Sequence, residues 1–302
     1  MTDIASTRLP AFKTSEGRAR YLAAYDGVLA EWPVAHEEIE VPTRLGSTFV
    51  MASGPHEASP LLLLPSFAGT ATAWRLNVAG LSRCFRTYAV DIIGQPGRSL
   101  ADRRLRDRHD YADWMADLLD GLGVGRASIV GCSFGGFLAA NQALMTPERV
   151  ARVVLISPAG VFASQYWKLT YAMRIRTPIA RLLRRLRGSR RAASMADFVR
   201  RAPRDAAWSA LMAVTMAEAP EVSVINASAF SRAELRAIHA PMLLLIGAEE
   251  TLYEPQATLR LAQARMPGLT GAVVPDADHI AAMAQPDDVN GRIIGFLQGG
   301  AR

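Results

Sequence analysis

The sequence of 302 residues has only two cysteines, Cys84 and Cys132, and no apolar run long enough to span a membrane. A membrane-spanning helix needs about 20 consecutive apolar residues. The first residues also lack the positively charged start and apolar stretch of a secretory signal. Two isolated cysteines are poor material for a disulfide framework. We therefore expect a cytoplasmic protein rather than an exported or membrane-spanning one.

Acidic residues are scarce in one segment only. Between Tyr171 and Arg204 the chain has eleven arginines and one acid, Asp197, while the other residues carry 27 acidic and 23 basic side chains. The net charge of +6 therefore arises locally. No nucleic-acid-binding motif accompanies it, so we expect no nucleic-acid partner.

Half of the residues are hydrophobic, which is enough for a large core. Continuously apolar runs, such as residues 60–65 and 150–156, are typical of parallel strands with helices on both faces. No clear strand pattern occurs between residues 161 and 239. We therefore expect an α/β core formed by residues 1–160 and 240–302, with a helical cap at 161–239.

The amino-terminal part predicts a helix followed by a hairpin. Residues 12–32 show helical spacing of apolar side chains, and Ser15 is the expected N-cap. Residues 37–43 and 47–52 alternate like two strands around a turn at Leu45 and Gly46. The hairpin should open the sheet as an antiparallel pair.

A Gly-x-Ser-x-Gly motif lies where an apolar strand meets a helical pattern. Ser133 is its central residue, between Gly131 and Gly135. A serine in such a strand-to-helix turn projects its hydroxyl from the sheet edge, and the glycines leave room where backbone crowds backbone. The following helix directs its positive end toward any anion formed on Ser133.

With this turn, and with an acid and a histidine downstream in that order, the chain resembles the α/β-hydrolase family from about Phe12 to Leu297. The resemblance implies a mostly parallel eight-stranded sheet flanked by helices, with an inserted helical cap. It also implies a carboxylesterase-like serine hydrolase that needs no metal and no organic cofactor. Epoxide and haloalkane chemistry is disfavoured, because those relatives use a carboxylate at the turn.

The resemblance assigns the general base to His279, the only one of five histidines that follows the last predicted strand. The family's acid commonly lies three residues beyond the glycine that ends the penultimate strand, and that position is Glu250. Glu249, Asp276 and Asp278 remain rivals, because spacing alone does not determine geometry.

Two backbone N–H groups are expected to form the oxyanion hole. One belongs to Phe134, the residue after the serine. The other belongs to Phe67, in the loop after the strand at residues 60–65. This loop departs from the family, since Pro65-Ser66 stands where a His-Gly pair is usual. An ordinary strand-to-helix loop is the alternative interpretation.

The proposed cap carries two further features. Residues 179–187 predict an amphipathic basic helix; contact with anionic lipid or an acidic carrier is one interpretation, and a cap helix with a solvated face is the favoured one. Aromatic and methionine side chains could line a bulky apolar acyl or alcohol pocket, although most should pack the cap's own core. They are Phe162, Tyr166, Trp167, Tyr171, Met195, Phe198, Trp208, Met212 and Met216.

The leading hypothesis is hydrolysis of carboxylic esters through an acyl-enzyme on Ser133, with a small-molecule, apolar acyl substrate. Thioester cleavage, acyl transfer, C–C hydrolysis and cyclisation use the same three groups and remain open. A ligand-binding protein without catalysis is the alternative from another class. The sequence leaves the oligomeric state open.

Overall fold

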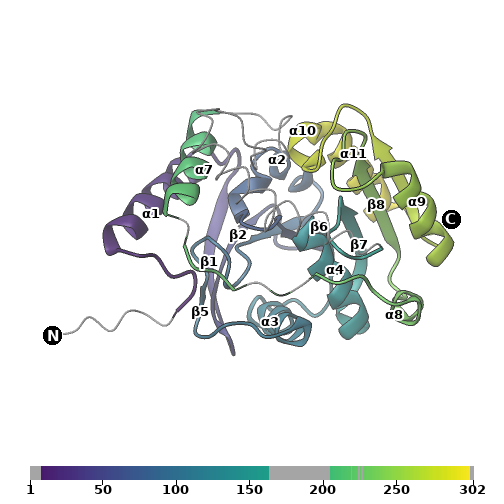
Figure 1. Ribbon diagram of the computed structural model, residues 1–302, viewed down its shortest axis with the longest axis horizontal. Coiled ribbons are helices and arrows are strands. Elements are labelled where there is room, and N and C mark those ends of the chain that lie inside the picture. Colours follow the sequence, from purple (N-terminus) through teal and green to yellow (C-terminus); the bar gives the residue numbers. More distant parts are fainter. Residues whose placement is uncertain (1–7, 163–204, 219, 224, 226, 300–302) are drawn as a thin grey trace, which may run out of the picture.

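A computed structural model describes residues 8–162, 205–218, 220–223, 225 and 227–299. Figure 1 shows a central sheet with helices on both sides. The strands are β1 (His36–Thr43), β2 (Gly46–Ser53), β3 (Pro60–Leu64), β4 (Arg86–Val90), β5 (Leu100–Ala101), β6 (Ala127–Cys132), β7 (Val150–Ile156), β8 (Met242–Gly247) and β9 (Thr270–Val274). The helices are α1 (Ser15–Leu29), η1 (Ala71–Trp74), α2 (Val78–Leu81), α3 (Arg108–Gly121), α4 (Phe134–Met145), η2 (Pro147–Arg149), α7 (Ala206–Glu218), α8 (Arg232–Ala237), α9 (Pro255–Arg265), α10 (Ala281–Ala284) and α11 (Pro286–Gln298).

The described strands form one mixed sheet in the order β1-β2-β4-β3-β6-β7-β8-β9. The strands from β4 to β9 along this order run parallel, and β2 pairs antiparallel with β1 and β4. These eight strands confirm the expected α/β architecture. The two-residue strand β5, which pairs with β2 beside this path, was not predicted.

The sheet separates two apolar cores, as the alternation along β3 illustrates. Leu62 and Leu64 pack on the face covered by α3, α4 and α9, whereas Leu61 and Leu63 pack on the face covered by α1, α2, α10 and α11. All four leucines are fully buried. Successive side chains on a strand point to opposite faces, so a continuously apolar strand serves both layers.

The strand order reverses at β3. The next parallel strand in the chain, β4, pairs with one side of β3, and β6 pairs with its other side. In open α/β sheets this switch leaves a crevice at the carboxyl ends of the strands. The loops after β3 and β6 therefore meet at the middle of one sheet edge.

Several predicted boundaries were wrong by a few residues. Thr14, not Ser15, caps α1, and its hydroxyl accepts the N–H of Gly17 at 3.0 Å. The hairpin turn uses Arg44 and Leu45, since Gly46 already pairs in β2. The apolar pattern of residues 86–94 predicts a further strand, but β4 ends at Val90. The helical pattern of residues 110–122 predicts a helix, and α3 begins two residues earlier, at Arg108.

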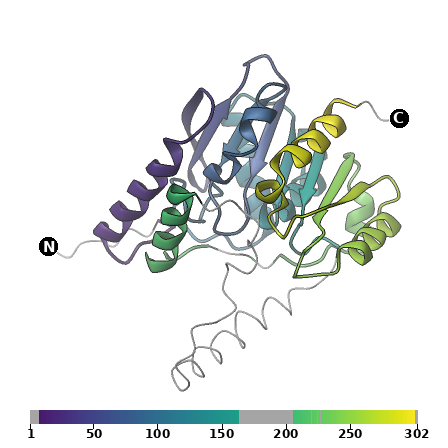
Figure 2. The same cartoon turned by 90° about the horizontal axis from the view of Figure 1, so that it is seen from above.

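Helix α7 lies beside the amino-terminal helix α1 in both Figure 1 and Figure 2. Arg20 on α1 forms an ion pair with Glu218 on α7. The start of α7 is held to the core by Asp205, which pairs with Arg75, and Arg75 also lies 4.7 Å from the ring centroid of Trp208. The amino-terminal helix thus supports α7.

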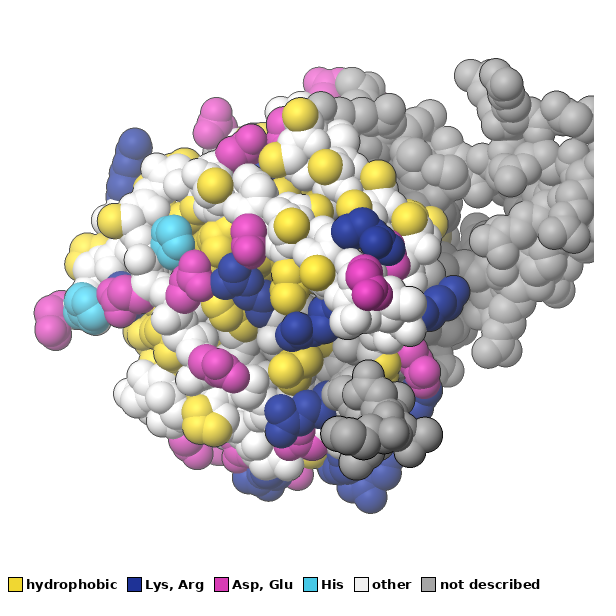
Figure 3. Space-filling model, turned by 90° about the vertical axis from the view of Figure 1, so that its left-hand side faces the viewer, with side chains coloured by type: hydrophobic (Ala, Val, Ile, Leu, Met, Phe, Trp, Pro, Cys, Tyr) yellow, Lys and Arg dark blue, Asp and Glu magenta, His cyan; other side chains and the backbone are white. Residues whose placement is uncertain are grey.

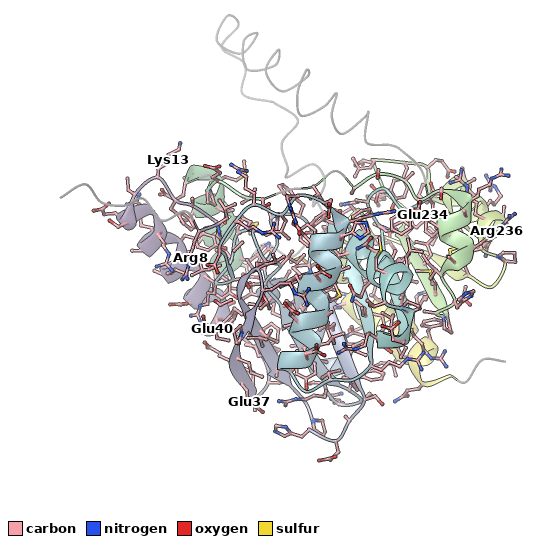
Figure 4. All side chains as sticks on the ribbon, turned by 90° about the horizontal axis from the view of Figure 1, so that it is seen from below. Arg8, Lys13, Glu37, Glu40, Glu234 and Arg236 are labelled. Carbon is pink, nitrogen blue, oxygen red and sulfur yellow. The ribbon has the colours of Figure 1, made fainter. Side chains whose placement is uncertain are left out.

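Charged residues protect the outer parts of the sheet. Glu37 and Glu40 lie on the edge strand β1 (Figure 4), and Glu37 pairs with Arg86 of β4 at 2.9 Å. Acidic and basic side chains are interspersed on the face shown in Figure 3. Charges on an edge strand oppose pairing with another chain. None of the helices in the described ranges has the length and hydropathy of a membrane span.

Candidate active site

Ser133 occupies a strained turn between β6 and α4. Its φ of 52° lies in the left-handed region that favours glycine. The surrounding backbone holds this conformation, because the N–H of Ser133 donates to Ile156 O (2.9 Å) and its carbonyl accepts from Phe137 (3.1 Å) and Ala159 (3.0 Å). A strained residue held by several bonds is a frequent feature of functional sites.

The two glycines of the motif are required by close backbone packing. A Cβ on Gly131 would lie 2.2 Å from the carbonyl oxygen of Gly135. A Cβ on Gly135 would lie 2.3 Å from that of Leu64, at the end of β3. Any side chain at either position would displace the turn, or separate it from the neighbouring strand.

His279 and Glu250 complete a hydrogen-bond chain with Ser133. His279 Nε2 lies 2.9 Å from Ser133 Oγ, and His279 Nδ1 lies 2.7 Å from Glu250 Oε2. An ionised carboxylate only accepts hydrogen bonds, so the ring carries its proton on Nδ1 and its Nε2 accepts from the serine hydroxyl. Serine and histidine lie 146 positions apart in the chain and meet because β6 and β9 end at the same sheet edge.

The Glu250 carboxylate is fixed at both oxygens. Its Oε1 accepts the backbone N–H groups of Thr251 (2.8 Å) and Leu252 (2.9 Å), which leaves Oε2 for His279. Burial raises the pKa of Glu250, but the adjacent His279 charge, their hydrogen bond and the Leu252 N–H lower it below its ordinary value. Glu250 is therefore ionised at neutral pH.

The rival acids occupy other positions. Asp276 is exposed, and Asp278 is buried and accepts the N–H of Ile280 at 3.1 Å. Glu249 is half-buried, and its N–H donates to Ala277 O. The hydrogen bond to the His279 ring is made by Glu250.

Ser157 and Tyr253 lie beside the Glu250 carboxylate and were not singled out in the sequence. The Ser157 hydroxyl contributes to lowering the pKa of Glu250. Burial, followed by the Glu250 charge, raises the pKa of Tyr253. Neither residue belongs to a short sequence motif. Both reach Glu250 through the packing of β7 against the loop after β8, which no local sequence pattern indicates.

The loop carrying Phe67 meets the start of α4, because Leu64 of β3 pairs with Gly131 of β6. The N–H of Gly135 donates to Pro65 O at 3.1 Å, which ties the turn to this loop. Neither the Phe67 N–H nor the Phe134 N–H donates to another residue in the described part of the chain. Both lie in the segments that meet beside Ser133.

Strained backbone conformations, with positive φ at residues other than glycine, cluster at this sheet edge. The non-glycine residues with positive φ in the described ranges are Ala68, Ser133, Ser157 and Asp276, which follow β3, β6, β7 and β9. All four loops therefore contain a conformation that packing must stabilise. Such clustering marks the carboxyl edge of the sheet as the functional one.

Cys132 precedes the serine, but its thiol faces the core. It is 4% exposed, and burial together with the charges of Glu250 and Asp278 raises its pKa to about 12. The neutral thiol is a poor nucleophile. In the described ranges, no group of three or more His, Cys, Asp or Glu side chains has the arrangement of a metal site.

Asp91 shapes the neighbouring loop from within the core. Its carboxylate accepts the N–H groups of Ala71 (2.6 Å) and Arg98 (2.7 Å) and lies 3.2 Å from the hydroxyl of Tyr25. It thus joins α1 to two loops at the sheet edge. Burial raises the pKa of Asp91 to about 6 despite these hydrogen bonds.

Some of the predicted features lie outside the described residues. They include the basic helix at 179–187 and the pocket candidates Tyr166, Trp167, Tyr171, Met195 and Phe198. Of the other candidates, Phe162 is buried in the core beside α4, and Trp208 and Met212 pack partly against the opposite core. Met216 is 64% exposed.

Comparison with known proteins identifies the family. The model of the family described as "Alpha/beta hydrolase family" matches residues 61–292. The chain belongs to the alpha/beta hydrolase family. The matched range contains Ser133, Glu250 and His279, and it excludes α1 and the β1–β2 hairpin of this hydrolase.

Similar proteins from Bacillus subtilis cover nearly the whole hydrolase. Carboxylesterase YbfK of strain 168 is 34% identical, over 96% of this chain and 98% of its own. The uncharacterized carboxylesterase nap of the same strain is 32% identical, over 94% of each. The crystal structure of naproxen esterase (carboxylesterase NP) matches with a TM-score of 0.80 and 30% identity, over 95% of this hydrolase and 100% of that chain.

Proposed function

We propose that this protein is a serine hydrolase that cleaves carboxylic esters through an acyl-enzyme intermediate on Ser133. The observation that carries the proposal is the continuous hydrogen-bond chain from Ser133 Oγ through the His279 ring to Glu250, with distances of 2.9 and 2.7 Å. The similar proteins named as carboxylesterases support an ester as the bond cleaved.

The first half of the reaction acylates the serine. A serine hydroxyl is a weak nucleophile until a base removes its proton. His279 Nε2, 2.9 Å away, takes that proton as Ser133 Oγ attacks the ester carbonyl carbon. Glu250 stabilises the imidazolium that forms. The protonated ring then gives its proton to the departing alcohol oxygen as the ester C–O bond breaks.

The second half releases the acid. Water replaces the alcohol, His279 Nε2 removes a proton from it, and the resulting hydroxide attacks the acyl carbon. The tetrahedral intermediate collapses, the bond to Ser133 Oγ breaks, and the serine regains its proton from the ring. The carboxylic acid leaves and the enzyme returns to its starting state.

The N–H groups of Phe134 and Phe67 are proposed to bind the oxyanion in both halves. Phe134 is the first residue of α4, so its N–H has no acceptor within the helix and lies at the positive end of the helix dipole. Phe67 contributes from the loop that Gly135 binds through Pro65. Loss of one such donor typically lowers the rate by about 10²- to 10³-fold.

We also propose that residues 161–239 form a cap over this edge and that the substrate is a small-molecule, apolar ester. Helices α7 and α8 lie within this range, and both belong to the part of it that the structure describes. The aromatic and methionine side chains named from the sequence as pocket candidates favour an apolar substrate. Both cysteines are free thiols, which suits a cytoplasmic enzyme.

Hydrolysis of p-nitrophenyl esters by wild type, Ser133→Ala and Ser82→Ala tests the function. Ser82 is a matched control, since it is 7% exposed, close to the 8% of Ser133, and lies at the end of α2. We expect Ser133→Ala to lower kcat by about 10⁴-fold or more and Ser82→Ala to leave it within about twofold. Unchanged activity in Ser133→Ala would overturn the proposal.

Thioesters with the same acyl groups, measured in parallel, test the bond that is cleaved. We expect a higher kcat/KM for the esters at each chain length. A reproducible preference for thioesters would leave Ser133 as the nucleophile but replace the proposed reaction with thioester cleavage. Tight binding of an ester without turnover would indicate a ligand-binding protein.

A further inference from the structure

The side chain of Gln95 lies outside the hydrogen-bond chain of the site but reaches the loop that carries Phe67. Gln95 follows β4 and is fully buried. Its own N–H donates to Ile92 O at 3.1 Å, which fixes the start of the side chain. A buried amide must satisfy its polar atoms within the protein, so its partners are informative.

The Gln95 amide joins two separate segments. Its Oε1 accepts the backbone N–H of Ala68 (3.4 Å), and its Nε2 donates to the carbonyl oxygen of Ser223 (2.6 Å). A backbone N–H can only donate and a carbonyl can only accept, so these partners determine the amide orientation. One side chain thereby connects the Phe67 loop with the segment that follows α7.

The loop needs such support because Ala68 has a φ of 58°. For a residue other than glycine, this left-handed conformation costs about 1 to 2 kcal/mol. The bond from Gly69 N–H to Ser66 O (2.9 Å) closes the turn, and Gln95 holds the peptide plane between Phe67 and Ala68. Tilting that plane would turn Phe67 and redirect its own N–H.

Ser223 provides a rigid anchor for this contact. Its N–H donates to Gly94 O (2.7 Å), and its hydroxyl accepts the N–H of Leu105 (2.7 Å). The Tyr111 hydroxyl also donates to the Ser223 carbonyl (3.4 Å), and the Tyr111 ring packs edge-on against Phe134 with centroids 5.6 Å apart. The same carbonyl therefore anchors contacts to Ala68, next to Phe67, and to Phe134.

We propose that Gln95 is a positioning residue for the oxyanion hole, which it aligns by holding Ala68 and Ser223 in one hydrogen-bond bridge. The inference rests on the proposed function, because it assigns the Phe67 N–H to the oxyanion. Gln95 acts through Ala68 and touches no reacting atom. The bridge also makes the alignment depend on docking of the segment after α7, which lies within the proposed cap.

Three variants test this inference. Gln95→Met keeps the length of the side chain but removes both hydrogen bonds. Gln95→Glu keeps an acceptor for Ala68 but, when ionised, cannot donate to Ser223. Gln142→Met is the control: Gln142 is also fully buried, lies on α4, and donates one side-chain bond, to Thr146 Oγ1 at 2.7 Å. The kcat and KM for an ester, melting temperature and inhibition by an alkyl boronic acid are measured for each.

The boronic acid reports on the oxyanion hole, because its tetrahedral adduct with a serine places an oxygen there. We expect Gln95→Met to lower kcat and boronic acid affinity by about 10- to 100-fold, with KM within about threefold, since small misplacements cost about 10²-fold. Gln142→Met should lower the melting temperature similarly and leave both other values near wild type.

Gln95→Glu keeps the inference testable if Gln95→Met does not fold. Its kcat, divided by that of wild type at the same pH, should rise as the pH falls from 8 to 6. Burial favours the protonated carboxyl in this range, and that form can again donate to Ser223. A ratio that does not change with pH would contradict the bridge.

Two failures are distinguishable. If Gln95→Met loses no more kcat or boronic acid affinity than Gln142→Met, the inference about Gln95 is wrong while the proposed function stands. If wild type hydrolyses esters no faster than Ser133→Ala, the proposed function is wrong, and the role of Gln95 fails with it.

Discussion

Glu250→Gln should convert the site to the wrong histidine tautomer while leaving its shape intact. Glu250 Oε1 accepts two backbone N–H groups, from Thr251 and Leu252, so the glutamine carbonyl must remain at that position. The new NH₂ group then faces His279 Nδ1, where the carboxylate oxygen lay at 2.7 Å. Because an NH₂ group donates, Nδ1 must accept, and the ring proton moves to Nε2.

This change of tautomer deprives the site of its general base, His279 Nε2. The Nε2–H would point at Ser133 Oγ, 2.9 Å away, with no lone pair left to accept the serine proton. The imidazolium also loses its carboxylate partner. The corresponding Asp→Asn change in a serine protease lowers kcat by about 10⁴-fold. We expect about 10³- to 10⁴-fold for Glu250→Gln, which corresponds to about 4 to 5.5 kcal/mol of activation free energy.

The assay is kcat for a short-chain p-nitrophenyl ester at saturating substrate, with Glu249→Gln as the control. Glu249 is the adjacent residue and carries the same charge, but it is half-buried and does not hold the His279 ring. We expect Glu249→Gln to stay within about twofold of wild type. Retention of more than about a tenth of kcat in Glu250→Gln, or an equal loss in both variants, would refute the reasoning.

The remaining predictions concern stability. Burial raises the pKa of Asp91 to about 6, so between about pH 4 and 6 the folded state keeps a proton that the unfolded chain has released. As the pH rises through this range, the free energy of unfolding of wild type should therefore fall by about 2 to 3 kcal/mol relative to that of Asp91→Asn. Urea unfolding of both proteins measures this change. A difference between them that stays constant with pH would contradict the prediction. Gly131→Ala should destabilise by about 3 kcal/mol or more, because its Cβ meets the Gly135 carbonyl at 2.2 Å. Gly291→Ala, within α11 and with nothing within 4 Å of its Cβ, should instead stabilise by about 0.5 to 1 kcal/mol, and equal melting temperatures for the two variants would disprove the packing argument.

The fold follows from local patterns to a large extent. The apolar strand before Ser133, the flanking glycines and the helix after it predict one turn, and the continuous leucines of β3 predict a strand covered on both faces. The family and the α/β architecture were confirmed. Helix ends were less predictable, because Thr14 and Ser15 are both favourable N-caps by residue type, and the hydroxyl that caps α1 is that of Thr14.

The environment of the site depends more on long-range packing. Glu250 and Glu249 are adjacent and chemically equivalent, and only the path of the loop after β8 brings one of them to His279. Gln95 lies in the loop after β4, and its partners Ala68 and Ser223 are 27 and 128 positions away. No short motif encodes contacts over such separations. The roles assigned to Ser133, His279, Glu250, Phe134 and Phe67 stay predictions.

Trapping of the acyl-enzyme tests the central claim most directly. Wild type and Ser133→Ala are mixed with a p-nitrophenyl ester, quenched in acid during turnover, digested and analysed by mass spectrometry. We predict that wild type carries the acyl group on Ser133 and that the variant carries none. An acyl group on Cys132, or steady turnover by wild type with no acylated peptide, would contradict the account.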